Sequence, residues 1–254
     1  MLVLDQHQPF WRRAMKIDFH VHTNHSVDAV HSPREMVKIA KKTGLDAIAI
    51  CDHNHLFPLR EARRLNREFG LVVISGIEGG NIAVQKHWIA MGISGKISKI
   101  RIDEILASIR QENGVSIAPH PHTRLGFGNY AALGFDGVES LNGSEPGSNR
   151  QVRNIRRIPE VAGSDSHALT MMGFCWTEVE ADGTVESILE SVRKGRCRPA
   201  GSSIPLLDLI SFYPLFIRHR VLRQPASAYA ATRQIIEDIK RVRAYESCAQ
   251  NCRT

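Results

Sequence analysis

The sequence has no apolar run of the roughly 20 residues that a membrane-spanning helix needs, although hydrophobic residues fill 43% of its 254 positions. Residues 1–14 also lack the apolar stretch that a signal peptide would carry after Arg12 and Arg13. We therefore expect a soluble protein with no membrane span. Charged residues reach 23%, which is ordinary for a globular chain and favours one main domain.

Cysteine is scarce, and the few that occur are scattered along the chain. The five are Cys51, Cys175, Cys197, Cys248 and Cys252. Their number is odd, and they do not form the paired spacing that a structural zinc site needs. This usage predicts a reducing, cytoplasmic setting.

Acidic residues are outnumbered, at 26 against 33 lysines and arginines, which gives a formal net charge of +7. A positive field concentrates phosphorylated or polyanionic ligands near a protein surface, so the balance favours such partners. Charge alone does not choose between nucleic acid and small phosphates. Histidine is abundant: 12 are present, most of them between His20 and His167. Imidazole suits both metal binding and proton transfer.

Short apolar segments alternate with segments of helical spacing. Expected strands cover residues 15–19, 46–51, 71–75, 87–91, 115–118, 137–139 and 161–163. Expected helices cover about residues 32–43, 58–69, 101–113 and 185–194, the first opened by a capping box at Ser32 and Glu35 with Pro33 between them. This alternation predicts an α/β fold with a closed or nearly closed barrel over residues 15–200. Residues 1–14 would form an N-terminal extension, and residues 201–254 a C-terminal helical extension.

Histidines and acidic residues gather where the expected strands end. The first strand leads into Asp18, His20 and His22, which alternation along a strand places on one side. The other strands lead into Asp52, His53 and His55, into Glu78, into His120 and His122, and into Asp165 and His167. Barrel enzymes assemble their active sites at this carboxyl end of the strands. Five such clusters in register with the strand ends predict one shared metal site.

A mixed set of imidazoles and carboxylates suits the hydrolysis of a phosphoester. The reaction needs a nucleophile at neutral pH and counter-charges for the phosphate oxygens. A divalent metal lowers the pKa of bound water from about 15.7 to about 7, and paired metals roughly 3.5 to 4 Å apart clamp the attacking and leaving oxygens. Imidazole nitrogens bind zinc, iron or manganese, and a carboxylate such as Glu78 can bridge two ions.

The motifs, in their order along the chain, resemble those of the polymerase and histidinol phosphatase (PHP) superfamily. The matching stretches are Asp18-Phe19-His20-Val21-His22-Thr23, Cys51-Asp52-His53-Asn54, Gly76-Ile77-Glu78, Ala118-Pro119-His120-Pro121 and Gly163-Ser164-Asp165-Ser166-His167. The resemblance covers about residues 15–200 and implies a distorted seven-stranded (β/α)7 TIM-like barrel. It also implies a site for two or three divalent ions, which would be zinc, manganese or iron. Cys51 stands where the family usually has threonine.

The resemblance further implies three groups of metal ligands that share Glu78. They are His20, His22, Glu78 and Asp165; Glu78, His87 and His120; and Asp28, His53 and His167. His25 lies close enough in sequence to compete with Asp28. Asp18 would stand behind the ligands and orient a ligand histidine.

Substrate contacts are expected from residues just beyond the motifs. Arg124 could bind a phosphate through two parallel N–H groups, and His122 or His55 could donate a hydrogen bond to it. Glu139 and Asn142, at the end of the sixth expected strand, would point toward the site and support ligands.

These features predict a metal-dependent hydrolase that acts on phosphoric ester bonds. Its expected substrates are phosphomonoesters, nucleotides or short oligonucleotides, attacked by metal-activated water. Three alternatives stay open: a histidinol-phosphate phosphatase, an amidohydrolase-type hydrolase and a non-catalytic module associated with nucleic acid. The bridging carboxylate of Glu78 disfavours the amidohydrolase type, which typically bridges its metals with a modified lysine. The complete ligand set disfavours the non-catalytic module.

Overall fold

The computed structural model describes residues 14–80, 86–95, 97–99, 101–128, 133–145, 158–211 and 214. Most of the expected extensions, residues 1–13 and 215–254, lie outside the described residues. The described strands are β1 (Met15–Val21), β2 (Ala47–Ile50), β3 (Val72–Gly80), β4 (His87–Met91), β5 (Val115–Ala118), β6 (Gly137–Asn142), β7 (Glu160–Gly163), β8 (Cys175–Val179) and β9 (Cys197–Gly201). The described helices are α1 (Pro33–Lys42), α2 (Leu59–Phe69), α3 (Ile102–Gln111), the short 3₁₀ helix η1 (Leu169–Met171) and α6 (Val185–Arg193).

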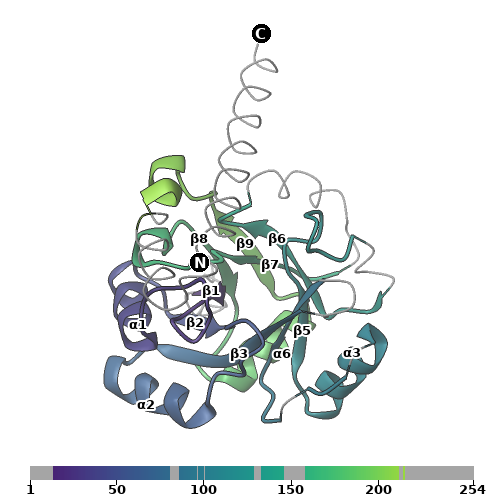
Figure 1. Ribbon diagram of the computed structural model, residues 1–254. Helices are drawn as coiled ribbons and strands as arrows, with labels where there is room; N and C mark the ends of the chain where they lie inside the picture. Colours follow the sequence, from purple (N-terminus) through teal and green to yellow (C-terminus); the bar gives the residue numbers. More distant parts are fainter. Residues whose placement is uncertain are drawn as a thin grey trace, which may run out of the picture.

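The nine strands form one mixed sheet in the order β7-β6-β5-β4-β3-β2-β1-β8-β9. Strands β1, β2 and β3 are parallel to one another, as are β5, β6 and β7. Strand β4 runs antiparallel between these two sets, and β8 and β9 add antiparallel pairs beside β1. Because β7 also contacts β1, β8 and β9, the sheet curls into a nearly closed barrel (Figure 1).

The count of seven strands is not confirmed, since β8 and β9 were not expected. Strand β8 alternates buried and partly exposed residues, which fits a strand at the border of the core. Strand β9 contains Pro199 and Gly201, two residues that disfavour a central strand. Its place at the end of the strand order explains why Pro199 is tolerated there, because an edge strand leaves one row of N–H groups unpaired.

The four expected helices are all present, and their ends follow local sequence signals. Helix α1 begins with the full capping box, in which the Ser32 side chain accepts from the Glu35 backbone and the Glu35 side chain accepts from Ser32. Such a cap stabilises a helix by about 1 kcal/mol. Helix α2 ends at Gly70, whose positive φ of 59° closes the last turn. None of the described helices is both long and apolar enough to span a bilayer.

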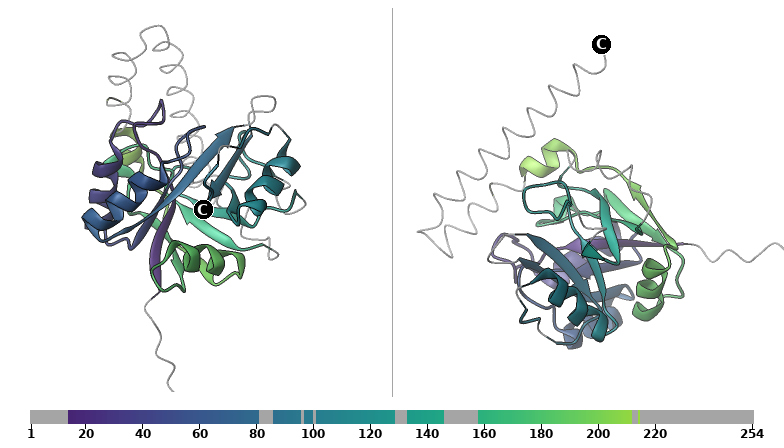
Figure 2. Two further views of the ribbon diagram at one scale, coloured as in Figure 1. Left: turned by 90° about the horizontal axis from the view of Figure 1, so that it is seen from below. Right: turned by 90° about the vertical axis from the view of Figure 1, so that its right-hand side faces the viewer.

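The helices cover three apolar clusters and thereby set which end of the barrel stays polar. Helices α1 and α2 pack on the outside of β2, and α3 covers a separate cluster with Trp88 and Val138. Figure 2 (left) shows α1 and α2 in purple and blue on one side of the strands, with α3 in teal on the other. Helix α6 inserts Ile188, Leu189 and Val192 among the inward residues of β1, β2, β5 and β7. The amino end of the barrel is therefore closed by apolar side chains.

Candidate metal centre

Glu78 lies at the centre of the polar cluster at the carboxyl end of the barrel. Strand β3 continues to Gly80, so Glu78 lies within the strand rather than after it. Its side chain is only 1% exposed. The Oε1 atom lies 2.8 Å from Nδ1 of His87 and 3.2 Å from Nε2 of His120. The Oε2 atom lies 2.9 Å from Nδ1 of His53 and 3.4 Å from Nε2 of both His20 and His22. One buried carboxylate therefore faces five imidazoles.

Two further carboxylates flank Glu78. Asp165 Oδ1 lies 3.1 Å from Nε2 of His22 and 3.5 Å from Nε2 of His20. We call His20, His22, Glu78 and Asp165 the inner group. Asp28 Oδ2 lies 3.2 Å from Nε2 of His53 and 3.5 Å from Nε2 of His167. We call Asp28, His53 and His167 the outer group.

All nine residues expected as metal ligands lie in this one cluster. The groups nonetheless overlap more than the family resemblance implied, since the ligand atoms of His22, His53 and His167 lie within 4.8 Å of one another, as do those of His53, Glu78 and His87. His25, the expected competitor of Asp28, turns away: its ring lies 4.9 Å from that of His55, and its Nδ1 is 3.7 Å from Asp52.

The direction of the strands explains why His87 reaches the cluster. His87 is the first residue of β4, not the last. Because β4 runs antiparallel to β3, its first residue pairs with Gly80 at the end of β3. A histidine at the amino end of β4 thus lies at the same end of the barrel as the carboxyl ends of the parallel strands.

Two cluster residues have backbone conformations that L-amino acids rarely adopt. His120 has a φ of 29° and Asp165 a φ of 54°, both in the left-handed region. Such conformations cost on the order of 1 to 3 kcal/mol and persist only where surrounding contacts hold them. The backbone N–H of Asp165 donates to the carbonyl of His20 at 2.8 Å, which ties the end of β7 to β1.

Four histidines direct Nε2 into the cluster and use Nδ1 for a contact with the protein. Nδ1 of His20 contacts Glu139 at 3.0 Å, and Nδ1 of His22 contacts Ser26 at 3.2 Å. Nδ1 of His120 contacts Thr123 at 3.0 Å, and Nδ1 of His167 contacts the Asp165 carbonyl at 2.9 Å. Metal-binding histidines are held in this way, with the second nitrogen fixing ring orientation.

Asp52 forms hydrogen bonds with the loop after β1, which carries Asp28 of the outer group. Its side chain accepts from the backbone and hydroxyl of Thr23 at 2.6 and 2.7 Å, and from the Ser26 hydroxyl at 3.0 Å. The Ser26 hydroxyl in turn accepts from the His53 backbone at 2.9 Å. Sequence reasoning gave no role to Thr23, although it ends the first motif, or to Ser26, because a hydroxyl residue in a loop does not by itself indicate which side chain it contacts.

Asp18 holds the backbone of His20 rather than its ring. Its Oδ1 accepts from the His20 backbone at 3.1 Å and from the Ser164 backbone at 2.9 Å. Strict alternation along β1 was expected, but the pairing of β1 with β2 shifts register between Asp18 and Val21. Asp18 thus contacts a candidate ligand histidine through its backbone, whereas the ring of His20 is contacted by Glu139. Burial raises the pKa of Asp18 to about 6, despite hydrogen bonds from Ser164.

The buried environment shifts the pKa values of Glu78 and His22. Burial alone would raise the pKa of Glu78, but the nearby His53, His20 and His87 hold it well below the ordinary value. Burial, together with His167 and His53, lowers the pKa of His22 to about 3. At neutral pH Glu78 is therefore a carboxylate, and His22 is a neutral imidazole with a free lone pair.

This donor set fits divalent cations. Nε2 of His20 and Nε2 of His22 face each other at 3.1 Å, although both lie beside Glu78. Among the described residues, no hydrogen bond reaches Oε2 of Glu78, which is buried and lies 2.9 Å from Nδ1 of His53. Oδ1 of Asp28 is likewise buried and has no hydrogen-bond partner in the described part of the chain. Buried carboxylate oxygens of this kind are costly unless a cation compensates them.

The residues expected to bind substrate lie close in sequence to the candidate ligands His53 and His120. Arg124 is exposed, and its backbone carbonyl accepts from Lys86 Nζ at 3.0 Å. His122 is half-buried two residues after His120, and His55 is exposed against His25. Their assignment to a substrate stays a prediction.

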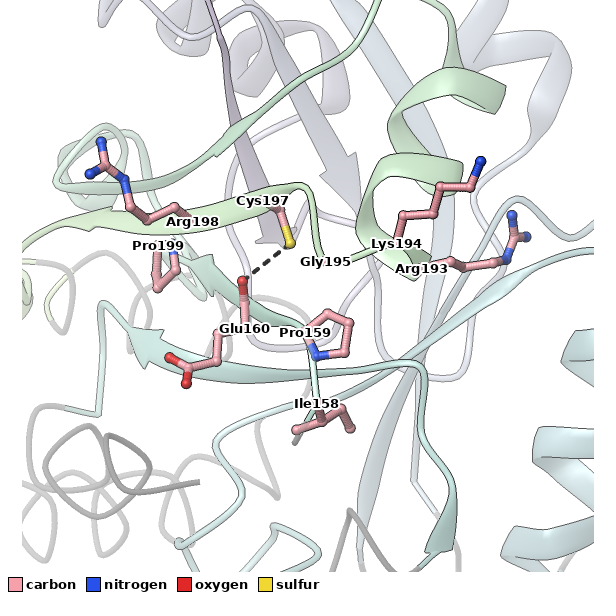
Figure 3. A pocket seen from close by; sticks show the side chains of 9 residues that line it. All are labelled: Ile158, Pro159, Glu160, Arg193, Lys194, Gly195, Cys197, Arg198 and Pro199. Carbon is pink, nitrogen blue, oxygen red and sulfur yellow. Dashed lines mark hydrogen bonds between the residues drawn. The ribbon is translucent and has the colours of Figure 1, made fainter. Parts of the chain in front are cut away.

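A pocket of about 530 Å³ lies at the opposite end of β7 (Figure 3). Glu160 begins β7 and lines this pocket, whereas Asp165 follows the other end of the same strand. The pocket's cations are already paired, Arg193 and Lys194 with Glu190 and Arg198 with Glu178. Burial raises the pKa of the Cys197 thiol to about 11, so it is not ionised at neutral pH. The chemistry of the fold is therefore concentrated in the histidine cluster.

Comparison with known proteins agrees with this geometry. Residues 18–128 match the PHP domain family, and residues 148–197 match a PHP-associated family. The chain is 33% identical over 146 residues to protein MJ1587 of Methanocaldococcus jannaschii, an alignment that covers 50% of this chain and 82% of that protein. The chain belongs to the PHP domain family. This confirms the resemblance inferred from the motifs.

Other similar proteins match over differing shares of their length. A 5'-3' exoribonuclease of Haemophilus influenzae is 35% identical over 78 residues, which cover 31% of this chain and 26% of that enzyme. Among solved structures, a two-domain protein from Bacteroides vulgatus contains a predicted PHP-like metal-dependent phosphoesterase. It matches with a TM-score of 0.56 at 18% identity, over 74% of this chain and 65% of that one. An amidohydrolase from Chromobacterium violaceum matches with a TM-score of 0.51 at 14% identity, over 77% and 96%. These two structures share the fold.

Proposed function

We propose that this PHP-family protein is a metal-dependent phosphoesterase that hydrolyses phosphomonoesters, nucleotides or short oligonucleotides. The observation that carries the proposal is the position of Glu78, a buried carboxylate within 3.4 Å of nitrogens from five histidines. An arrangement of this kind serves the binding of more than one cation by a shared carboxylate. The exoribonuclease among the relatives supports a nucleic-acid-related substrate.

Three sets of ligands would each hold one ion. They are the inner group, Glu78 with His87 and His120, and the outer group. Divalent ions such as zinc, manganese or iron would activate a water molecule there and offset charge on the phosphoryl oxygens. The chain's own part is to hold the rings in place through their Nδ1 contacts with Glu139, Ser26 and Thr123. Arg124, His122 and His55 would bind the phosphate or orient the leaving group. The net charge of +7 favours the approach of an anionic substrate.

Metal analysis and a substrate panel test this proposal. Purified protein is expected to contain two or three divalent ions per chain and to hydrolyse at least one phosphate ester. The panel contains p-nitrophenyl phosphate, histidinol phosphate, nucleoside bisphosphates and short oligonucleotides, with a cyclic amide as the arm for amidohydrolase activity. Cleavage of the amide alone, or bound metal with no hydrolysis of any compound, would contradict the proposal.

A further inference from the structure

Glu139 is a carboxylate of β6 that is only 2% exposed, yet both of its oxygens have partners. Oε1 contacts Nδ1 of His20 at 3.0 Å. Oε2 accepts from the backbone N–H of His120 and from the side-chain amide of Asn142, both at 2.8 Å. Glu139 itself stays outside the set of nine candidate ligands. It nevertheless contacts two of them directly.

The contact with His20 fixes which ring nitrogen carries a proton. An ionised carboxylate only accepts hydrogen bonds, so Nδ1 of His20 must be the donor. The other nitrogen, Nε2, then faces Glu78 at 3.4 Å and Asp165 at 3.5 Å. Glu139 thus leaves Nε2 as the nitrogen of His20 that can bind a cation.

The second oxygen stabilises an unusual backbone. His120 has a φ of 29°, and its N–H donates to Oε2 of Glu139. The amide of Asn142, which also donates to Oε2, lies 3.3 Å from Oδ2 of Asp165, the other strained residue. Glu139 therefore connects β1 with the end of β5, and Asn142, which donates to Glu139, extends the connection to the end of β7.

Gly163 leaves room for the contact between Glu139 and His20. A Cβ atom added to Gly163 would lie 2.4 Å from both Oε1 of Glu139 and Cβ of His20. Such distances are far shorter than van der Waals contact, so only glycine at position 163 lets the two side chains approach as they do.

We infer that Glu139 is a positioning residue that holds two candidate ligands in the geometry for cation binding, His20 of the inner group through its ring and His120 through its backbone, and that it leaves the outer group intact. This rests on the proposed function, because it concerns the same metal centre. Partners of this kind change metal affinity by about 10- to 100-fold when they are removed.

Glutamine at position 139 gives the sharpest test because it keeps the shape of the side chain. Its carbonyl oxygen would take the position of Oε2, where two donors converge, and its NH₂ group would face Nδ1 of His20. Two donors cannot pair, so His20 would have to give up the proton on Nδ1 and place it on Nε2, where the cation is expected.

The experiment compares the full chain with E139Q and with the matched control E186Q, which changes an exposed glutamate of α6. Zinc alone is titrated into metal-free protein by calorimetry, and thermal unfolding of the metal-free forms is measured in parallel. Nitrogen NMR of histidine-labelled, zinc-loaded protein follows the Nδ1–H signal of His20, assigned by its loss in H20Q. In E139Q we expect one zinc site to weaken about 10- to 100-fold, the other sites to be unchanged, and the Nδ1–H signal to disappear. E186Q should match the wild type.

The results distinguish failure of the proposed function from failure of the role inferred for Glu139. If wild-type protein binds no zinc, the titration is repeated with manganese and iron(II), and failure to bind any of the three ions refutes the proposed function itself. If the wild type binds zinc and E139Q binds it with the same affinity and keeps the Nδ1–H signal, only the role of Glu139 is refuted. A uniform loss at every zinc site would also refute it, because that result indicates a general structural role. If E139Q does not fold, E139D takes its place: its shorter side chain cannot reach both partners, and wild-type zinc affinity in E139D would overturn the inference.

Discussion

The two ends of the barrel are filled by opposite kinds of side chain. At the amino end, Ile188, Leu189 and Val192 of α6 close the interior against apolar residues of the strands. At the carboxyl end, the side chains of His20 and Glu78 are buried to 0% and 1% exposure. Burial of apolar surface stabilises a fold, whereas burial of polar groups costs free energy unless they are paired. The amino end therefore supplies stability, and the carboxyl end carries the chemistry.

Because the two ends differ in this way, we expect a variant to change either the stability of the fold or the activity, but not both. A substitution in the histidine cluster removes a group that was costly to bury, so the fold should survive it. A substitution under α6 leaves a cavity far from the cluster, so the cluster should keep its cations. Variants that changed both properties together would show that the two ends are coupled.

The largest loss of activity is expected from E78A. The substitution removes the one carboxylate that faces five histidines, so metal content should fall and hydrolysis of p-nitrophenyl phosphate should be abolished. D165A should act in the same way. Circular dichroism should still show a folded chain, and E186A serves as the exposed control. Full activity in either variant would refute the assignment of these carboxylates as ligands.

A smaller loss is expected from S26A. The Ser26 hydroxyl contacts Nδ1 of His22, donates to Asp52 and accepts from the His53 backbone. Without it, the inner and outer groups lose a shared support, and metal affinity should fall by about 10-fold. Metal titration measures this effect. S108A, which alters a half-buried serine of α3, should bind metal like the wild type, and an unchanged affinity in S26A would remove Ser26 from the site.

The sequence predicted which candidate ligands meet at the carboxyl end of the barrel better than it predicted the residues that hold them in place. The apolar runs of β2, β5 and β7 are short, buried and followed by the motifs, and the ends of parallel strands meet at one edge. That geometry alone brings residues such as His53, His120 and Asp165 together. Strand β8 was missed although Cys175 to Val179 alternate in burial, because a five-residue alternation with polar members does not stand out from a loop.

The residues that hold the candidate ligands in place do so through tertiary contacts that no short motif encodes. Asp18 was expected to orient a ligand histidine, and its side chain contacts the backbone of His20; the carboxylate that contacts the His20 ring is Glu139, which lies 119 residues further along the chain. Ser26 and Thr23 meet Asp52 from positions about 26 to 29 residues away in sequence. Their contacts depend on how the loop after β1 folds back over β2, which local propensity does not determine.

A modest effect on substrate binding is expected from R124A. The side chain is exposed and follows the ligand motif at His120, and loss of a guanidinium that pairs with phosphate should raise KM several-fold with little change in kcat. Metal content should stay at the wild-type level. The control is R101A, because Arg101 is exposed and pairs with Asp103. An unchanged KM would remove Arg124 from the substrate site.

The smallest effect on activity, and the largest on stability, is expected from L189A. Leu189 is 4% exposed and packs in the cluster that closes the amino end of the barrel. Removing its side chain should lower the free energy of unfolding by about 2 to 5 kcal/mol, measured by denaturant titration. L207A makes the same change at a leucine that is 82% exposed and should cost almost nothing. Since α6 lies away from the histidines, the metal content and kcat of folded L189A should equal those of the wild type, and a loss of bound metal in L189A would show that the apolar end also holds the ligands in place.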